Sequence, residues 1–215
     1  NARSWLDFYS RNTNQLNKPY IYLCIKSVIE QNGGNMKVCI IDDNSFAKLL
    51  PSWKIDMSSV PEPSKQQVRA LGMSKLLYYY GGISVPHSFV CTKNLMSLLS
   101  NGRSMFCVEA RDHSINSTVT SFMPSPVMMG CVKHSEEMKE YIQYLERNIS
   151  TDYTFETSFL NNNNRVLLDM VQKNRVSLLD AGYVGQKDVN GDEISIDRLL
   201  RKEYIDFNPE MYGIL

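Results

Sequence analysis

The sequence lacks the features that would indicate a membrane span, a signal peptide or a nucleic-acid-binding surface. No apolar run approaches the ~18 residues needed to cross a bilayer, and no signal peptide is recognisable. The 23 basic residues balance the 23 acidic ones, so bulk electrostatic capture of nucleic acid or anionic lipid is not expected. Because the chain begins at Asn1 rather than at methionine, we expect a processed product or part of a longer chain, in which a membrane tether could lie outside these residues.

Cysteine patterns typical of zinc sites or of disulfide frameworks are also missing. The cysteines are odd in number, widely separated and mostly set in apolar runs: Cys24, Cys39, Cys91, Cys107 and Cys131. No CxxC or Cys/His spacing of a zinc site is present. We therefore predict five buried, reduced thiols and no metal bound through cysteine.

Helical patterns alternate with short, strongly hydrophobic segments along the chain. The predicted helices are Tyr20–Glu30, a short one ending at Leu50, Lys65–Tyr80, Lys93–Leu99, Ser135–Arg147 and Phe155–Lys173, the last interrupted by the Asn161–Asn164 run. The predicted strands are Lys37–Ile41, Ile83–Val85, Met105–Glu109, Val127–Val132 and Val176–Leu179. Residues 51–64 and 110–126 are predicted to be irregular, and the asparagine run is predicted to mark a loop.

This alternation predicts one α/β domain over residues 19–215, preceded by an N-terminal arm or linker over residues 1–18. A chain of 215 residues can bury one adequate core. We expect a mostly parallel sheet with helices on both faces. Ligands of such folds bind at the edge where the strands end in their carboxyl termini.

The segment Leu76–Leu95 carries the most specific pattern. A helix ending in Tyr80-Gly81-Gly82 is followed by a short strand, a turn and Thr92-Lys93-Asn94-Leu95. This resembles the core signature of DXD-type glycosyltransferases, the families that include yeast mannosyltransferases and bacterial capsular polysaccharide synthesis proteins. The resemblance covers roughly residues 18–100 and implies a glycosyltransferase-A-like fold. In these families two acids after the strand hold Mg²⁺ or Mn²⁺ against a sugar diphosphate.

The sequence departs from the family where the metal would bind. Pro86, His87 and Ser88 occupy the acid-x-acid position, and none of them is a good ligand for a hard cation. Ala70 and Met73 stand where the families place an Asp and an Arg on the preceding helix. The resemblance therefore implies a degenerate DXD motif, with Mn²⁺ or Mg²⁺ binding lost and no cofactor.

Other residues could still serve a site at this edge. Asp42 and Asp43 are candidates for contacting a nucleotide, with capping of the following helix as the alternative. If the chain is active, His87, Glu109 and Asp112 are the acid–base candidates, and exposed loop charges are the alternative. His113 belongs to the same group, and Tyr78, Tyr79 and Tyr80 could stack on a base or a sugar.

Two functions of different class remain open. The first is a non-catalytic, degenerate glycosyltransferase-like module with a structural or binding role. The whole sequence also looks similar to uncharacterised proteins of large icosahedral DNA viruses, which implies a minor capsid or other virion component and partners among capsid proteins. The second is an active, metal-independent glycosyltransferase using a nucleotide-sugar donor. It requires a cluster among Lys75, Lys93, Arg103 and Arg111 to stabilise the leaving diphosphate.

Overall fold

The computed structural model describes residues 18–62, 64–100, 102–112, 121–151, 156–201 and 203–215. The helices are α1 (Lys18–Asn32), α2 (Asp43–Leu49), α3 (Ser64–Tyr80), α4 (Met96–Leu99), α5 (Glu136–Thr151), α6 (Glu156–Gln172), the 3-10 helix η1 (Ala181–Val184) and α7 (Ile196–Leu200). The strands are β1 (Gly82–Ser84), β2 (Val90–Cys91), β3 (Met105–Arg111), β4 (Phe122–Cys131), β5 (Ser177–Leu179) and β6 (Gly213–Ile214). The predicted N-terminal arm lies outside the described residues, apart from Lys18, which begins α1.

The chain forms a mixed α/β structure around a four-stranded sheet with the strand order β1-β4-β3-β5. The expectation of a mostly parallel sheet is wrong. Strand β4 runs antiparallel to both of its neighbours, and only β3 and β5 pair in parallel. A second, two-stranded sheet joins β2 to β6.

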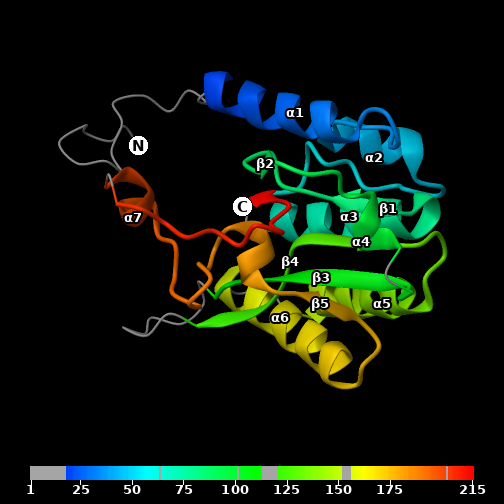
Figure 1. The fold of residues 1–215 in the computed structure, drawn as a ribbon. Coiled ribbons are helices and arrows are strands. Elements are labelled where there is room, and N and C mark those ends of the chain that lie inside the picture. The colour runs from blue at the N-terminus through cyan, green and yellow to red at the C-terminus, as the bar shows by residue number, and fades with distance from the viewer. Residues whose placement is uncertain (1–17, 63, 101, 113–120, 152–155, 202) are drawn as a thin grey trace.

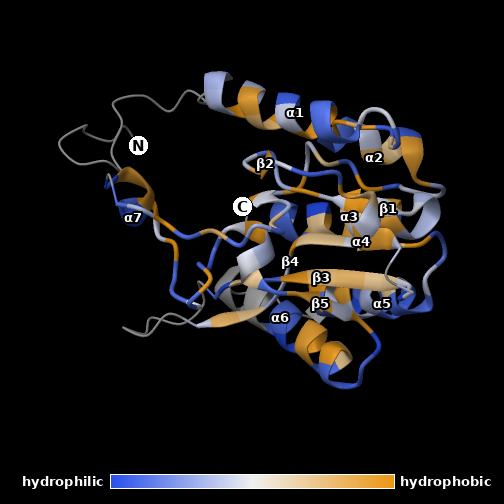
Figure 2. Cartoon of the chain, in the orientation of Figure 1, coloured by the Kyte–Doolittle hydropathy of each residue, from blue (hydrophilic) through white to orange (hydrophobic). Residues whose placement is uncertain are grey.

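Apolar cores cover both faces of the central sheet, and Figures 1 and 2 show its long, apolar strand β3 between layers of helices. Alternate side chains of β3 point to opposite faces because the side-chain period of a strand is two. Met105 and Cys107 belong to a core formed with α3, α5 and α6. Phe106 and Val108 belong to a second core, which contains the β2 and α4 segments, η1 and part of the C-terminal segment. The prediction of helices on both faces is therefore confirmed.

The segment Lys37–Ile41 is the main local error of the sequence prediction. It belongs to no strand, and Ile40 is 72% exposed. The two ends of the segment are held in place: Met36, just before it, packs against the second core, and Ile41, its last residue, packs against a third core around Phe46. The β-branched composition indicated strand propensity, but none of the described strands pairs with this segment.

Two other boundaries differ from the prediction. The asparagine run lies within α6 rather than in a loop, and Asn163 is fully buried there. Strand β4 begins at Phe122, inside the segment predicted to be irregular. In both places the backbone is held by the tertiary structure, which overrides the weak local preference of polar residues and proline. None of the helices in the described ranges is both long and apolar enough to span a bilayer.

Candidate functional site

The topology brings the ends of three strands to one edge of the central sheet. Because β1 and β3 both run antiparallel to β4, they point in the same direction, and β5 runs parallel to β3. The segments that follow these strands contain Pro86–Ser88, Asp112 and Asp180, respectively. The predicted sites at positions 86–88 and 109–112 therefore lie toward the same carboxyl edge, on strands separated by β4.

The Pro86–Ser88 segment is a tight turn that is hydrogen-bonded to α1. The Phe89 amide donates to the Pro86 carbonyl at 3.0 Å, which closes the turn. The Tyr20 hydroxyl of α1 donates to the Ser88 carbonyl at 2.9 Å. The side chain of His87 is exposed. The degenerate motif thus follows β1 at the sheet edge, where it presents a proline, a histidine and a serine rather than a pair of carboxylates.

Glu109 is engaged in an ion pair at the same edge. Its Oε2 accepts from Lys187 Nζ at 2.6 Å and from the Ala181 amide at 3.2 Å. Lys187 Nζ also lies 4.4 Å from the centre of the Phe122 ring. Lys187 is a site residue that the sequence interpretation missed, since it lies far along the chain in a polar segment with no motif. These contacts tie β3 to η1 and give Glu109 a cationic partner.

Asp112 is buried just beyond the end of β3, and its amide donates to the Ser121 carbonyl at 2.8 Å. His113 lies outside the described residues. The acid–base candidates His87, Glu109 and Asp112 therefore lie toward the same edge of the sheet.

Asp42 and Asp43 both have structural partners around α2. Asp42 is the N-cap: its Oδ1 accepts from the Ser45 amide at 2.8 Å, and the Asp42 amide donates to Ser45 Oγ at 3.1 Å. Asp43 accepts two hydrogen bonds of 2.7 Å from Arg69 of α3. The hydrogen bond from Ser45 holds the pKa of Asp42 below its usual range, and the Arg69 guanidinium does the same for the pKa of Asp43. Asp42 therefore caps α2, which is the alternative role considered from the sequence. Nucleotide contact by Asp42 or Asp43 stays a prediction.

The four cationic side chains that could replace a metal are held by different parts of the molecule. Lys75 pairs with Glu146 of α5 at 2.7 Å, and Lys93 pairs with Glu210 of the C-terminal segment at 3.0 Å. Arg111 pairs with Glu193 at 2.7 Å. Arg103 donates to the carbonyl and side-chain oxygens of Asn174. Each of the four cationic side chains is therefore engaged by its own partner, and these partners lie on different segments of the chain.

The C-terminal segment joins the chain that follows β1 to the chain that follows β5. The Thr92 amide donates to the Tyr212 carbonyl at 2.8 Å, and the Leu215 amide donates to the Val184 carbonyl at 3.0 Å. Gly213 lies so close to Phe89 that a β-carbon there would be 2.5 Å from the ring and 2.2 Å from the Val90 oxygen. Apolar side chains and strand β6 therefore fill the part of the second core that lies toward the carboxyl edge of the sheet.

The tyrosines at the end of α3 have partners in the folded chain. Tyr78 packs edge-on against Tyr79 and His134. Tyr80 is 60% exposed, and its hydroxyl donates to the Leu49 carbonyl at 2.7 Å. Gly81 and Gly82 follow with φ values of +71° and +109°, which glycine adopts without strain. The aromatic helix end and the paired glycines thus set the entry of the chain into β1.

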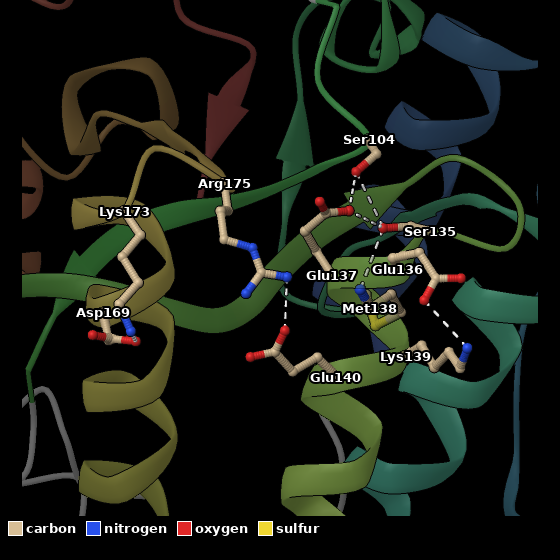
Figure 3. Close-up of polar contacts among 10 residues, drawn as sticks. All are labelled: Ser104, Ser135, Glu136, Glu137, Met138, Lys139, Glu140, Asp169, Lys173 and Arg175. Atoms are coloured by element: carbon tan, nitrogen blue, oxygen red, sulfur yellow. Dashed lines mark hydrogen bonds and ion pairs between the residues drawn. The ribbon is translucent and has the colours of Figure 1, made fainter.

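A second polar cluster lies at the opposite edge of the sheet, where β3 begins (Figure 3). Ser104 and Ser135 both donate to Glu137 Oε2, and the Met138 amide donates to Ser135 Oγ at 3.3 Å. Burial alone would raise the pKa of Glu137, but the hydrogen bonds from Ser104 and Ser135 hold that pKa below its usual range. The cluster caps the amino end of α5 and links it to β3, which is a structural role.

Within the described ranges no group of three or more histidine, cysteine, aspartate or glutamate side chains is arranged to hold a metal ion. The chain matches no family model, and no curated protein is significantly similar to it.

Proposed function

We propose that this chain is a degenerate glycosyltransferase-A-like domain that acts as a structural or binding module rather than as an enzyme. One observation carries the proposal: after β1, the position of the two acids of the DXD motif is occupied by a Pro-His-Ser turn. Without a metal or a cationic cluster, no identified group would stabilise a leaving diphosphate. The ion pairs of Asp43, Glu109 and Lys93 support the same interpretation, since each charge already has a partner.

The direct test is a calorimetric titration of the purified chain with uridine or guanosine diphosphate sugars in the presence of Mn²⁺. We expect no binding at micromolar concentrations. Metal-dependent binding in that range would overturn the proposal, because it would require a cation site that the residues at positions 86–88 cannot supply.

Restoring acids at the degenerate motif provides a second test. We expect Pro86→Asp with Ser88→Asp to leave the thermal midpoint within a few degrees of the wild-type value. The two hydrogen bonds of this turn that involve Pro86 and Ser88 use their carbonyl oxygens, which the substitutions keep. A large loss of stability would show that these side chains have a packing role and that the turn is not a vacated ligand site. Arg69→Gln, which removes the partner of Asp43, serves as a comparison for a substitution that breaks a side-chain contact.

A virion component is the specific structural role that we propose, with capsid proteins as partners. The prediction is that the protein remains with purified particles after washing in high salt. Release into the wash, or absence from the particles, would contradict that role without reviving an enzymatic one.

The alternative, a metal-independent glycosyltransferase, is favoured by one feature, the ion pair of Glu109 with Lys187 beside the strand ends. That pair would have to open so that Lys187 could face a diphosphate. Transfer or hydrolysis of a nucleotide sugar in the presence of EDTA, lost in Lys187→Met and retained in Lys75→Met, would establish this alternative.

A further inference from the structure

The sequence contains Asn-Gly pairs at positions 32–33, 101–102 and 190–191. In such a pair the backbone nitrogen of the glycine can attack the side-chain carbon of the asparagine, because glycine has no β-carbon to hinder the approach. The attack requires local freedom of the backbone, so the surroundings of each pair decide its rate. Asn101 lies outside the described residues, while the other two pairs lie in contrasting surroundings.

The first pair is held inside the fold at the end of α1. Asn32 is buried, and its Nδ2 donates to the Val28 carbonyl at 2.9 Å. Its Oδ1 accepts from the Leu95 amide at 2.7 Å. The Gly33 amide, whose nitrogen would have to attack, donates to the Ile29 carbonyl at 2.8 Å. Reaction at Asn32 therefore requires several buried contacts to break at once.

The third pair lies at the tip of a tight turn on the surface. The Asp188 amide donates to the Asp192 carbonyl at 2.9 Å, and the Gly191 amide donates to the Asp188 carbonyl at 3.0 Å. Asn190 and Gly191 are both exposed, and Gly191 has a φ of +86°. The nitrogen that would attack is thus held by a hydrogen bond at an exposed loop tip, where local opening costs little free energy.

We propose that Asn190 is a site of spontaneous deamidation in the folded protein. The Gly191 nitrogen forms a bond to Cγ of Asn190. The bond from Cγ to Nδ2 breaks, and ammonia leaves with the proton of the Gly191 amide. Water then opens the succinimide ring at either carbonyl carbon. One opening gives aspartate at position 190, and the other gives isoaspartate, whose backbone is longer by one carbon atom.

The carboxylate of Asp188 connects this turn to α7. Its Oδ1 accepts from the amides of Asn190 and Asp192, at 3.0 and 2.9 Å, and its Oδ2 accepts from Arg198 at 3.0 Å. An additional backbone carbon between positions 190 and 191 changes the spacing of the two amides, so that they no longer fit one oxygen. Isoaspartate should therefore loosen the turn and weaken its link to α7, whereas aspartate keeps the backbone unchanged.

The experiment is ageing of the purified chain at physiological temperature and pH 8, followed by peptide mapping in a mass spectrometer. Each deamidated peptide gains one dalton, and chromatography separates its aspartate and isoaspartate forms. We expect deamidation at position 190 to be at least ~tenfold faster than at position 32, because an exposed turn opens far more often than a buried helix end. In guanidinium chloride the two positions should react at similar rates.

Two variants serve as controls. Asn190→Gln should abolish the product at position 190, because glutamine would have to form a larger ring, and it should leave position 32 unchanged. Reaction at position 32 as fast as at position 190 in the folded protein would overturn the proposal. So would an Asn190 that stays intact in the folded protein after the denatured protein has reacted. The proposal does not depend on whether the chain has enzymatic activity.

The consequence for α7 is tested by the thermal midpoint of the aged protein. We expect the midpoint of the wild type to fall as isoaspartate accumulates, while Asn190→Asp and the aged Asn190→Gln protein keep the original value. Limited proteolysis should show faster cleavage near α7 in the aged wild type. An unchanged midpoint and cleavage pattern in protein that contains isoaspartate at position 190 would contradict the role assigned to Asp188.

Discussion

At the residue scale, the cysteines show how far composition predicts burial. Cys24, Cys91, Cys107 and Cys131 are buried and reduced, as the sequence predicted, but Cys39 is exposed. Burial raises the pKa of both Cys107 and Cys131 to about 12. A thiol that is inaccessible and protonated at neutral pH does not react readily.

We therefore predict that a thiol reagent modifies one cysteine rapidly in the native protein at pH 8 and all five after denaturation. Cys39→Ser should remove the rapid phase, whereas Cys91→Ser should leave it. Rapid modification of two or more thiols in the folded wild type would contradict the burial of the other four. The reaction is measured by the absorbance of the released thiolate.

Asp42 is a residue for which the sequence left two roles open. A capping box was recognisable in principle, since Ser45 stands three residues after Asp42 at the start of a helix. The ion pair between Asp43 and Arg69 was not, because it joins residues of two helices whose packing the sequence does not specify. Local partners could therefore be predicted, while partners distant along the chain could not.

At the element scale, the helices were predicted better than the strands. Each described helix from α1 to α6 overlaps a predicted one, because an apolar stripe at helical spacing is a local property. The strand prediction for Lys37–Ile41 was wrong because a strand is stabilised only when another strand pairs with it. The predicted interruption of α6 was wrong because Asn163 and Asn164 lie within the helix and their side chains are buried.

The packing of α2 on α3 depends on a glycine. Gly72 lies against Phe46, and a β-carbon at position 72 would come within 2.7 Å of the Phe46 ring. We predict that Gly72→Ala lowers the free energy of unfolding by about 1–3 kcal/mol, since overpacking outweighs the gain in helix propensity. Urea denaturation measures this change. Gly34→Ala, where nothing lies within 4 Å, is the matched control and should change stability by less than about 0.5 kcal/mol. An unchanged or more stable Gly72→Ala protein would contradict the packing.

The same contact between helices should depend on pH. Hydrogen bonding and charge from Arg69 hold the folded-state pKa of Asp43 below its ordinary value of 3.8. The ion pair therefore stabilises the fold above about pH 4 and loses its effect as the pH falls through the lowered pKa. The stability difference between the wild type and Arg69→Gln should be largest near pH 6 and shrink toward pH 3.

Trp53 packs against Phe46 and reports on this region by fluorescence. The measurement is urea unfolding in a Trp5→Phe background, so that Trp53 is the single tryptophan. Lys173→Gln, which removes an exposed pair within a single segment, is the control and should show little change with pH. A wild-type advantage over Arg69→Gln that persists undiminished at pH 3 would contradict the assigned role of Asp43.

At the scale of the whole molecule, the α/β class was predicted and the direction of the strands was not. The parallel arrangement was inferred from helices alternating with strands. However, the sequence predicts no helix between β3 and β4, and parallel neighbours need a crossover of about a dozen or more residues. The predicted connection over residues 110–126 was long enough for a crossover. The antiparallel pair became evident only because β3 extends to Arg111 and β4 begins at Phe122.

The closure of the carboxyl edge by residues 211–215 could not be predicted, because Gly213 and Ile214 carry no motif. We predict that deletion of these five residues lowers the thermal midpoint and increases binding of a hydrophobic dye, since Phe89 loses its cover. The deletion should not create micromolar binding of a nucleotide sugar, because positions 86–88 still lack the two acids of the DXD motif. Gly213→Ala should lower stability in the same direction but less severely. An unchanged midpoint in the deletion variant would contradict the structural role of β6.

The pairing of β2 with β6 joins residues more than a hundred positions apart, Val90 with Ile214. During translation, the first half of the chain emerges from the ribosome well before the strand that covers it. The hydrophobic surface around Phe89 must therefore wait, exposed to chaperones and to premature association, until the downstream residues have been made. Folding of this domain should be completed late, and nascent chains stalled before position 211 should be sensitive to proteases.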